Sequence, residues 1–261
     1  MTQDTNPVLL ARDGAIATIT LNRPAAHNAL DVPMVRAFRE ACETLEGDDG
    51  VRAVILRGAG RNFSVGGDLA AMRPDPGTVA PQLIEALHAG LLILAAIDAP
   101  VIASLHGAVA GGSLSLAMAC DLAIASDKAR FNLAYARIGA SCDGSSSWHL
   151  PRLVGLRRAL EIALLSEDID AAEALRIGLV NRVVPDADLA RETQALAERL
   201  AAGPTKAYGR LKRLMRRSLH SDLPSQLDAE AAAFRDGTRT HDFVEGVEAF
   251  FAKRVPKFEG R

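Results

Sequence analysis

The stretch Phe63-Ser-Val-Gly-Gly-Asp-Leu69 decides how this sequence is interpreted. It follows residues 51–57, an apolar run that predicts a buried strand. It lies within residues 58–76, which are rich in Gly, Pro and Asp and therefore predict a long loop. Two adjacent glycines leave backbone amides open to a ligand. Asp68 is expected to cap the next helical turn, because Asp accepts hydrogen bonds from amides at a helix N-terminus.

A second glycine-rich stretch, Gly107-Ala-Val-Ala-Gly-Gly-Ser113, stands between a predicted strand at residues 101–105 and a helix of small residues. Backbone amides at a helix N-terminus favour an anion or oxyanion site. The stretch is not a phosphate-binding P-loop, because no Lys follows Gly112, and it does not have the GxGxxG spacing. Taken alone, it fits close packing of a strand on a helix equally well.

The rest of the pattern indicates an α/β protein. Short β runs at residues 8–11 and 15–21 flank an Asp-Gly turn, and another strand is predicted at residues 121–126. Asp31 is expected to cap an early helix, and residues 83–97 predict a second one. Later helices are expected at residues 156–165, 171–177, 188–202, 205–219, 226–234 and 242–253. We predict an α/β core over residues 1–203 and a C-terminal helical region over residues 204–261.

Composition narrows the class of protein. The chain has 261 residues, 49% of them hydrophobic and 24% charged, which predicts a globular protein rather than a disordered one. A net charge of −2 argues against a general nucleic-acid binder. The longest strongly apolar run, residues 91–97, is far shorter than the ~18–20 residues that span a bilayer. No signal peptide and no CxxC pair are seen, so we expect a cytoplasmic protein that associates with neither membrane nor metal.

Three further segments are informative: Leu21-Asn-Arg-Pro24 with Asn28-Ala-Leu30, Leu150-Pro-Arg-Leu-Val-Gly155, and Glu245-Gly-Val-Glu-Ala-Phe250 with Ala252-Lys-Arg254. Together with the two glycine-rich stretches, these segments resemble the crotonase, or enoyl-CoA hydratase/isomerase, superfamily over essentially the whole chain. The resemblance implies stacked ββα units, a C-terminal helical region, and a homotrimer or homohexamer. It also implies acyl-CoA thioester substrates and no separate cofactor, since coenzyme A is part of the substrate.

By position, the resemblance places two oxyanion-hole amides at Val65 and Gly112. An enolate made from a thioester carries negative charge on its carbonyl oxygen, and losing one amide donor to that oxygen typically costs about 3–4 kcal/mol. The resemblance also implies which residues bind the coenzyme A portion, two of them reaching the site of an adjacent subunit from the C-terminal region. These residues are His27, Ala29, Ser64, Gly66, Asp68, Leu69 and, from the C-terminal region, Phe250 and Lys253.

The chain departs from the hydratases of this superfamily at two positions. Hydratases use two glutamates, and Ser115 and Tyr135 stand in their place. Neither hydroxyl is an ordinary base near neutral pH, which disfavours hydration by two carboxylates. A new acid, Asp143, resembles the arrangement in ring-epoxide isomerases of phenylacetyl-CoA degradation and in Δ3,Δ2-enoyl-CoA isomerases. Asp143 is therefore interpreted as an acid/base, with a helix N-cap or a nucleophile as alternatives.

The predicted function is an enoyl-CoA isomerase that shifts a C=C bond through a thioester dienolate. The main alternative is an enoyl-CoA hydratase that holds water with Asp143, Ser115 or Tyr135. Thioester hydrolysis, dehalogenation and a non-enzymatic RNA-binding role are further alternatives. The sequence leaves open the acyl-chain length, an aromatic or aliphatic substrate, fatty acid or phenylacetate catabolism, and trimer or hexamer.

Several polar residues invite other interpretations. His149 is close to Ser145–Ser147, but without a GxSxG motif a catalytic triad is disfavoured, and we expect His149 to be structural. Cys142 is expected to be a small buried thiol. A basic helix face is expected to be solvated, with an acidic neighbour or nucleotide phosphates as alternatives. That face consists of Lys212, Arg213, Arg216 and Arg217.

Overall fold

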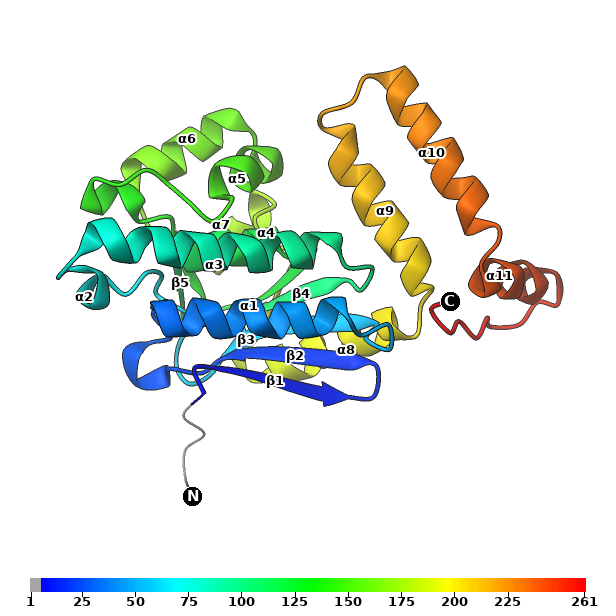
Figure 1. The fold of residues 1–261 in the computed structure, drawn as a ribbon, viewed down its shortest axis with the longest axis horizontal. Helices are drawn as coiled ribbons and strands as arrows, with labels where there is room; N and C mark the ends of the chain where they lie inside the picture. Colours follow the sequence, from blue (N-terminus) through cyan, green and yellow to red (C-terminus); the bar gives the residue numbers. More distant parts are fainter. Residues whose placement is uncertain (1–5) are drawn as a thin grey trace.

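The computed structural model describes residues 6–261 and centres on a six-stranded sheet with the order β1-β2-β3-β4-β6-β9 (Figure 1). β1 pairs with β2 in antiparallel fashion, and every other neighbour in this sheet is parallel. The strands span Val8–Asp13 (β1), Ile16–Leu21 (β2), Ala53–Gly58 (β3), Val101–Leu105 (β4), Leu122–Ser126 (β6) and Arg182–Val184 (β9). The predicted mixed α/β core with a helical C-terminal region is confirmed.

Both faces of this sheet are buried, and the side chains of β3 alternate between them. Val54 and Leu56 join the larger core beneath helices α1 (Val32–Glu46) and α3 (Pro76–Ala96). Ala53 and Ile55 join a smaller core under helix α8 (Leu189–Ala201). Parallel strands covered on both faces read as nearly continuous apolar runs, which is why their sequence signal is strong.

A second, smaller sheet consists of β5 (Ala108–Ala110), β7 (Arg130–Asn132) and β8 (Ile169–Asp170). β5 falls inside the second glycine-rich stretch, and for none of these three strands did the sequence predict a strand. Each has only two or three residues, too few for a period of two to show in the sequence.

Two long helices, α1 (Val32–Glu46) and α3 (Pro76–Ala96), run side by side over the sheet (Figure 1). Asp31 caps α1 as predicted, accepting a hydrogen bond from the amide of Met34 at 2.9 Å. The helices approach closely at Gly90, where an added Cβ would lie 2.6 Å from the Phe38 ring. α3 begins at Pro76 instead of residue 83, so a short helix, α2 (Leu69–Met72), and the start of α3 occupy part of the predicted loop region.

By length and composition alone, α3 could cross a bilayer. Residues 91–97, taken alone from the sequence, are only part of this helix, so the length of the apolar segment was underestimated. In the structure, however, α3 packs against α1 and buries Leu83, Leu87, Leu91 and Leu94 in the main core. One face of α3 therefore contributes to the main core.

The other helices of the first 203 residues flank the sheets. They are α4 (Gly112–Ala119), α5 (Ser146–Val154), α6 (Leu156–Leu165) and α7 (Ala171–Arg176), with short 3-10 turns η1 (Pro24–Ala26), η2 (Tyr135–Ile138) and η3 (Asp186–Asp188). α4 is buried along its whole length because its residues are small or apolar. Its N-terminus, at Gly112, follows β5 directly.

The C-terminal helices α9 (Thr205–Ser218), α10 (Leu223–Gly237) and α11 (His241–Phe251) extend to one side of the core (Figure 1). Between them lies an apolar groove of about 1050 Å³, which we call the C-terminal groove. Its lining includes Leu211, Leu214, Leu227, Phe234, Phe243 and Phe250. The predicted division at residues 203 and 204 falls in the turn between α8 and α9 and stays a prediction.

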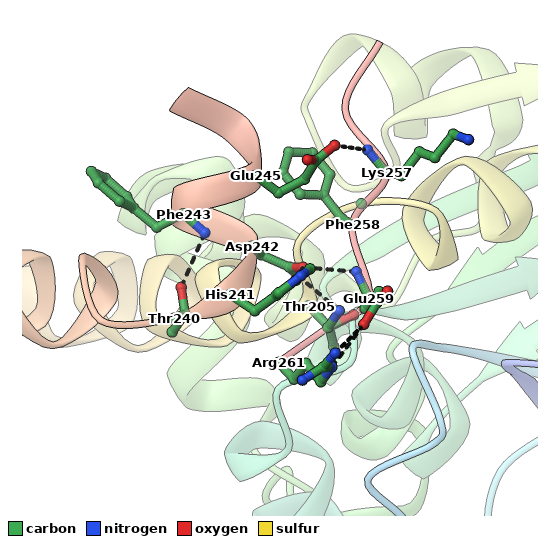
Figure 2. A network of polar contacts seen from close by, with 12 residues as sticks. Thr205, Thr240, His241, Asp242, Phe243, Glu245, Lys257, Phe258, Glu259 and Arg261 are labelled. Carbon is green, nitrogen blue, oxygen red and sulfur yellow. Dashed lines mark hydrogen bonds and ion pairs between the residues drawn. The ribbon is translucent and has the colours of Figure 1, made fainter. Parts of the chain in front are cut away.

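The last residues fold back onto the start of α11, as Figure 2 shows. The buried carboxylate of Asp242 accepts hydrogen bonds from the amides of Glu259, at 2.7 Å, and Gly260, at 2.8 Å. The guanidinium of Arg52, next to β3, donates to the carbonyl oxygen of Phe258 at 3.1 Å. The terminal segment therefore ties the far end of the helical region to the central sheet.

The expectation that the basic face of α9 is solvated is wrong for two of its four residues, Lys212 and Arg216, which are half-buried. The ammonium of Lys212 donates to the carbonyl oxygens of Ile97 and Ala99 at 3.1 and 3.0 Å and lies 2.7 Å from the Asp121 carboxylate. Arg216 pairs with the same carboxylate at 2.8 Å. The acidic-neighbour alternative holds, because unsatisfied carbonyls after the end of α3 and a half-buried Asp need cationic partners. Burial lowers the pKa of Lys212.

We expect Lys212→Met to lower the free energy of unfolding by about 1–3 kcal/mol, since it leaves charged and carbonyl groups without their donor. The matched control is Arg217→Met, on the exposed side of the same helix, where surface substitutions usually stay within about 0.5 kcal/mol. Urea denaturation of both variants at one protein concentration measures the difference. Equal losses in the two variants would show that the contact does not anchor α9.

Candidate active site

The two glycine-rich stretches lie side by side in the structure. The amide of Ser64 donates to the carbonyl of Ala108 at 3.1 Å, and the amide of Ala110 donates to the carbonyl of Ser64 at 3.1 Å. This short parallel pairing extends the small sheet by one strand position. Gly66 follows with a φ of +93°, and a Cβ there would lie 2.8 Å from the carbonyl oxygen of Ala110. Only glycine fits this close approach.

The carboxamide of Asn28 holds the same region together from a fully buried position. Its nitrogen donates to the carbonyls of Ala59 and Asn62, each at 2.8 Å, and its oxygen accepts from the amide of Arg23 at 2.8 Å. The hydroxyl of Ser64 donates to the carbonyl of Asn28 at 2.6 Å. Asn28 stood in a recognised motif, but the sequence did not reveal that its side chain organises the loop.

The pairing of Leu30 with residues 66–68 sets the direction of one exposed amide. The amide of Leu30 donates to the carbonyl of Gly66 at 2.7 Å, and the amide of Asp68 donates to the carbonyl of Leu30 at 2.9 Å. In a parallel pair, one residue makes both hydrogen bonds to the two neighbours of the residue opposite it, and that opposite residue makes neither of these bonds. The N–H of Gly67, which stands opposite Leu30, therefore points to the other side.

Two amides of the site are candidates for binding an oxyanion. Within residues 6–261, no hydrogen-bond acceptor is found for the amide of Gly67 or for that of Gly112, the first residue of α4. The amide of Val65, predicted as an oxyanion donor, is instead directed at the carbonyl oxygen of His27, at 3.3 Å. The oxyanion role predicted for Gly112 and Val65 stays a prediction, and the amide of Gly67 is a further candidate donor.

The acid Asp143 stands beside the Gly112 amide. The hydroxyl of Tyr135 donates to Oδ1 of Asp143, and the hydroxyl of Ser115 lies 3.2 Å from that of Tyr135. A methyl group placed on Gly112 would lie 3.7 Å from Oδ1 of Asp143 and 3.6 Å from the Tyr135 oxygen. The structure therefore brings together all four of these predicted residues, which come from α4, from η2 and from the loop before α5.

Electrostatics define the state of this cluster. Burial raises the pKa of the Tyr135 hydroxyl, and the neighbouring charge of Asp143 raises it further. Tyr135 therefore keeps its proton and donates it in a hydrogen bond to Asp143. The alternative role of Asp143 as a side-chain N-cap is not supported, because Ser145 occupies the N-cap position of α5 and the Asp143 carboxylate points at Tyr135.

The predicted coenzyme A residues from the core divide into two groups. Ser64 and Gly66 are buried and bond to neighbouring protein groups, and Ala29 is also buried, so these positions form the inner wall of the loop. Asp68 caps α2 by accepting from the amide of Ala71 at 3.0 Å, which confirms its expected structural role. The exposed residues His27 and Leu69 present surface that a ligand can reach, and their contact with coenzyme A stays a prediction.

Phe250 and Lys253 are not near this cluster within one chain. Phe250 lies in the last turn of α11 and Lys253 just after it, and α11 lies at the opposite end of the molecule from α2 (Figure 1). The Phe250 side chain is 77% exposed. Their predicted part in a coenzyme A site therefore requires a second copy of the chain.

Two histidines contact the residues that directly follow Asp143. Nδ1 of His149 lies 2.9 Å from the Ser145 hydroxyl, and burial, with nearby Arg216, lowers the His149 pKa to about 4, which fits a structural role. His88 on α3 accepts a hydrogen bond from the amide of Gly144 at 3.2 Å, a contact that sequence reasoning missed. Cys142 is half-buried rather than buried as expected.

The fold and the paired glycine loops define a crotonase-type protein, and comparison with known proteins identifies the family. Residues 11–261 match the family model for enoyl-CoA hydratase/isomerase. The chain is 39% identical to a probable enoyl-CoA hydratase of Rhodobacter capsulatus, over 94% of this chain and 95% of the relative. It is 37% identical to a 1,2-epoxyphenylacetyl-CoA isomerase of Escherichia coli, with the same coverage.

A solved structure supports the same family. A putative enoyl-CoA hydratase/isomerase from Mycobacterium abscessus superimposes with a TM-score of 0.93 at 39% identity, covering 97% of this chain and all of that one. The chain therefore belongs to the enoyl-CoA hydratase/isomerase family, as the five segments predicted. It is an enzyme of that family and fits its acyl-CoA substrates.

The pKa of His149 yields a test in solution. In the unfolded chain this histidine takes up a proton near pH 6.5, but in the folded protein only near pH 4, so stability falls as the pH drops through that window. His149→Asn retains a polar atom near the position of Nδ1 and does not titrate. We expect the variant to lose less stability than the parent between pH 7 and pH 5, measured by urea denaturation. An identical loss in both proteins would contradict the assignment.

Proposed function

We propose that this enzyme is an enoyl-CoA isomerase that moves the double bond of a 3-enoyl-CoA into conjugation with the thioester, giving a 2-enoyl-CoA. The observation that carries the proposal is a single carboxylate, Asp143, held by Tyr135 beside the Gly112 amide. Hydration through two carboxylates would need a second acid, and Ser115 and Tyr135 provide only hydroxyls.

In the proposed mechanism, Asp143 removes a proton from the α-carbon of the substrate. The electron pair delocalises over the alkene and the thioester, so negative charge develops on the carbonyl oxygen of a dienolate. The protonated Asp143 then returns the same proton to the γ-carbon, which leaves the double bond between the α- and β-carbons. One carboxylate suffices, because the proton moves along one face of the dienolate.

Two backbone amides are proposed to stabilise the dienolate oxygen. Gly112 supplies one from the N-terminus of α4, where the helix dipole adds a favourable positive potential. We place the other at Gly67 instead of Val65, since the amide of Gly67 points away from the Leu30 pairing and that of Val65 faces the carbonyl of His27. Because both donors belong to the backbone, they are fixed before substrate binds.

Enoyl-CoA hydratase activity is the alternative that the same assay tests. Incubation with 3-enoyl-, 2-enoyl- and aromatic acyl-CoA esters, with products read by mass and NMR, separates the reactions. A shifted double bond at constant mass supports isomerisation, whereas a gain of one water shows hydration. A melting assay with CoA esters and with RNA tests the non-enzymatic role, for which the net charge of −2 offers little support.

The proposal needs no cofactor besides the coenzyme A of the substrate, because proton transfer and oxyanion stabilisation use only protein groups. We further propose a cytoplasmic location. The free thiols of Cys42, Cys120 and Cys142 are compatible with a reducing compartment.

We expect Asp143→Asn to lower kcat for isomerisation by about 10²–10⁴-fold with little change in the binding of CoA esters, the usual contribution of a general base. Asp143→Ala is expected to be similarly impaired. Ser115→Ala is the matched control at the neighbouring hydroxyl and is expected to lose far less. Full turnover by Asp143→Asn would exclude Asp143 as the acid/base.

We also propose that the enzyme assembles as a homotrimer or homohexamer through the C-terminal region. The C-terminal groove of about 1050 Å³ and exposed side chains such as Phe250 and Phe251 leave apolar surface that a second copy can cover. Light scattering at micromolar concentration is expected to give three or six times the chain mass of 27.6 kDa. A monomeric mass would contradict the proposal.

A further inference from the structure

We infer that His88 is a positioning residue for Asp143: its Nε2 accepts a hydrogen bond from the amide of Gly144 at 3.2 Å and so fixes the peptide that carries the acid. The inference rests on the proposed function, in which Asp143 moves the proton. His88 lies on α3, far from Asp143 in sequence, and the two segments meet only in the folded protein.

The direction of this hydrogen bond defines the state of the His88 ring. A backbone amide can only donate, so Nε2 must offer its lone pair, and the ring is neutral with its proton on Nδ1. The lone pair is engaged with Gly144 in this arrangement. His88 is therefore not available as a second base, and its contribution acts through Asp143.

The peptide between Asp143 and Gly144 is held at both ends. His88 holds its N–H, while its carbonyl oxygen accepts from the amide of Ser146 at 3.2 Å and from the Ser146 hydroxyl at 2.9 Å. Because a peptide unit is planar and includes the Cα atom of Asp143, fixing the plane fixes the position of the atom from which the Asp143 side chain leaves the backbone. Tyr135 then holds the carboxylate itself.

The backbone here needs such support. Gly144 and Ser145 both have left-handed conformations, with φ of +57° and +71°, and no strand ladder holds them. A Cβ on Gly144 would lie 2.9 Å from Cβ of Ser115 and 3.4 Å from Cδ2 of Leu87, so the turn is enclosed by α4 and by α3. α3 thus supplies both the apolar wall, through Leu87, and the polar contact, through His88.

Three substitutions separate positioning from proton transfer. In His88→Gln the side-chain oxygen reaches the place of Nε2 and accepts the same hydrogen bond, whereas in His88→Asn the shorter side chain does not, and His88→Ala has no acceptor. We expect His88→Ala and His88→Asn to lower kcat by about 10- to 100-fold with KM nearly unchanged, because a small misplacement of a reacting group costs that much. The variant His88→Gln is expected to keep kcat within about threefold of the parent enzyme.

Full kcat in His88→Ala would overturn the inference, and so would an equal loss in Gln and Ala, which would indicate proton transfer by the ring. Asp143→Asn, assayed alongside, shows separately whether the proposed function holds. Crystal structures of the Ala and Gln variants test the positioning whichever reaction the enzyme catalyses. The Asp143–Gly144 peptide is expected to rotate in Ala and to stay in place in Gln, and an unmoved peptide in Ala would overturn the inference.

Discussion

The short pairing between residues 63–67 and residues 108–112 is the contact on which the site depends. Only two backbone hydrogen bonds join Ser64 to β5, at 3.1 Å each, yet they bring the Gly67 loop against the N-terminus of α4. Asn28 and the Ser64 hydroxyl stabilise the loop from behind with buried hydrogen bonds. Such bonds are costly to break in a dry interior, so the amides of Gly67 and Gly112 are held in place without any ligand.

The cluster at Asp143 combines one carboxylate with two hydroxyls, and the proposed reaction depends on this combination. Where hydratases of this superfamily have two glutamates, Ser115 and Tyr135 form a chain of hydroxyls that ends on one carboxylate. Their burial keeps the tyrosine protonated, so the pair orients Asp143 and adds no second charge. The backbone that would stabilise the oxyanion is untouched by these side-chain differences, which is how one fold serves several reactions of acyl thioesters.

The sequence predicted the parts of the fold with strong local signals. Strands buried on both faces, such as β2 and β4, and capped helices, such as α1 after Asp31, agree with the structure. Strands β7, β8 and β9 were not predicted, because segments of two or three residues are too short to show the alternation of apolar and polar residues that marks a strand. The basic face of α9 was misassigned because a stripe of cations looks the same whether it faces water or the end of another helix.

Within the site, residues that belong to motifs could be predicted from the sequence, but the directions of backbone amides and the contacts between distant segments could not. Gly112, Ser115, Tyr135 and Asp143 were named from the sequence and meet in the structure. The preference for Gly67 over Val65 depends on which way an amide points, and residue type does not encode that. His88 belongs to no motif, and strands β4 to β7 and helix α4 separate it from Asp143 along the chain, so only the folded chain reveals their relation.

The central claim is that the amides of Gly67 and Gly112 hold the thioester oxygen while Asp143 faces the α-carbon. A crystal structure of the enzyme with a saturated acyl-CoA thioester, which has no double bond to shift, tests it directly. The account predicts the thioester oxygen at about 2.7–3.1 Å from both amide nitrogens, with the Asp143 carboxylate next to the α-carbon. An oxygen bound at the Val65 amide, or an acyl chain that passes away from Asp143, would contradict it.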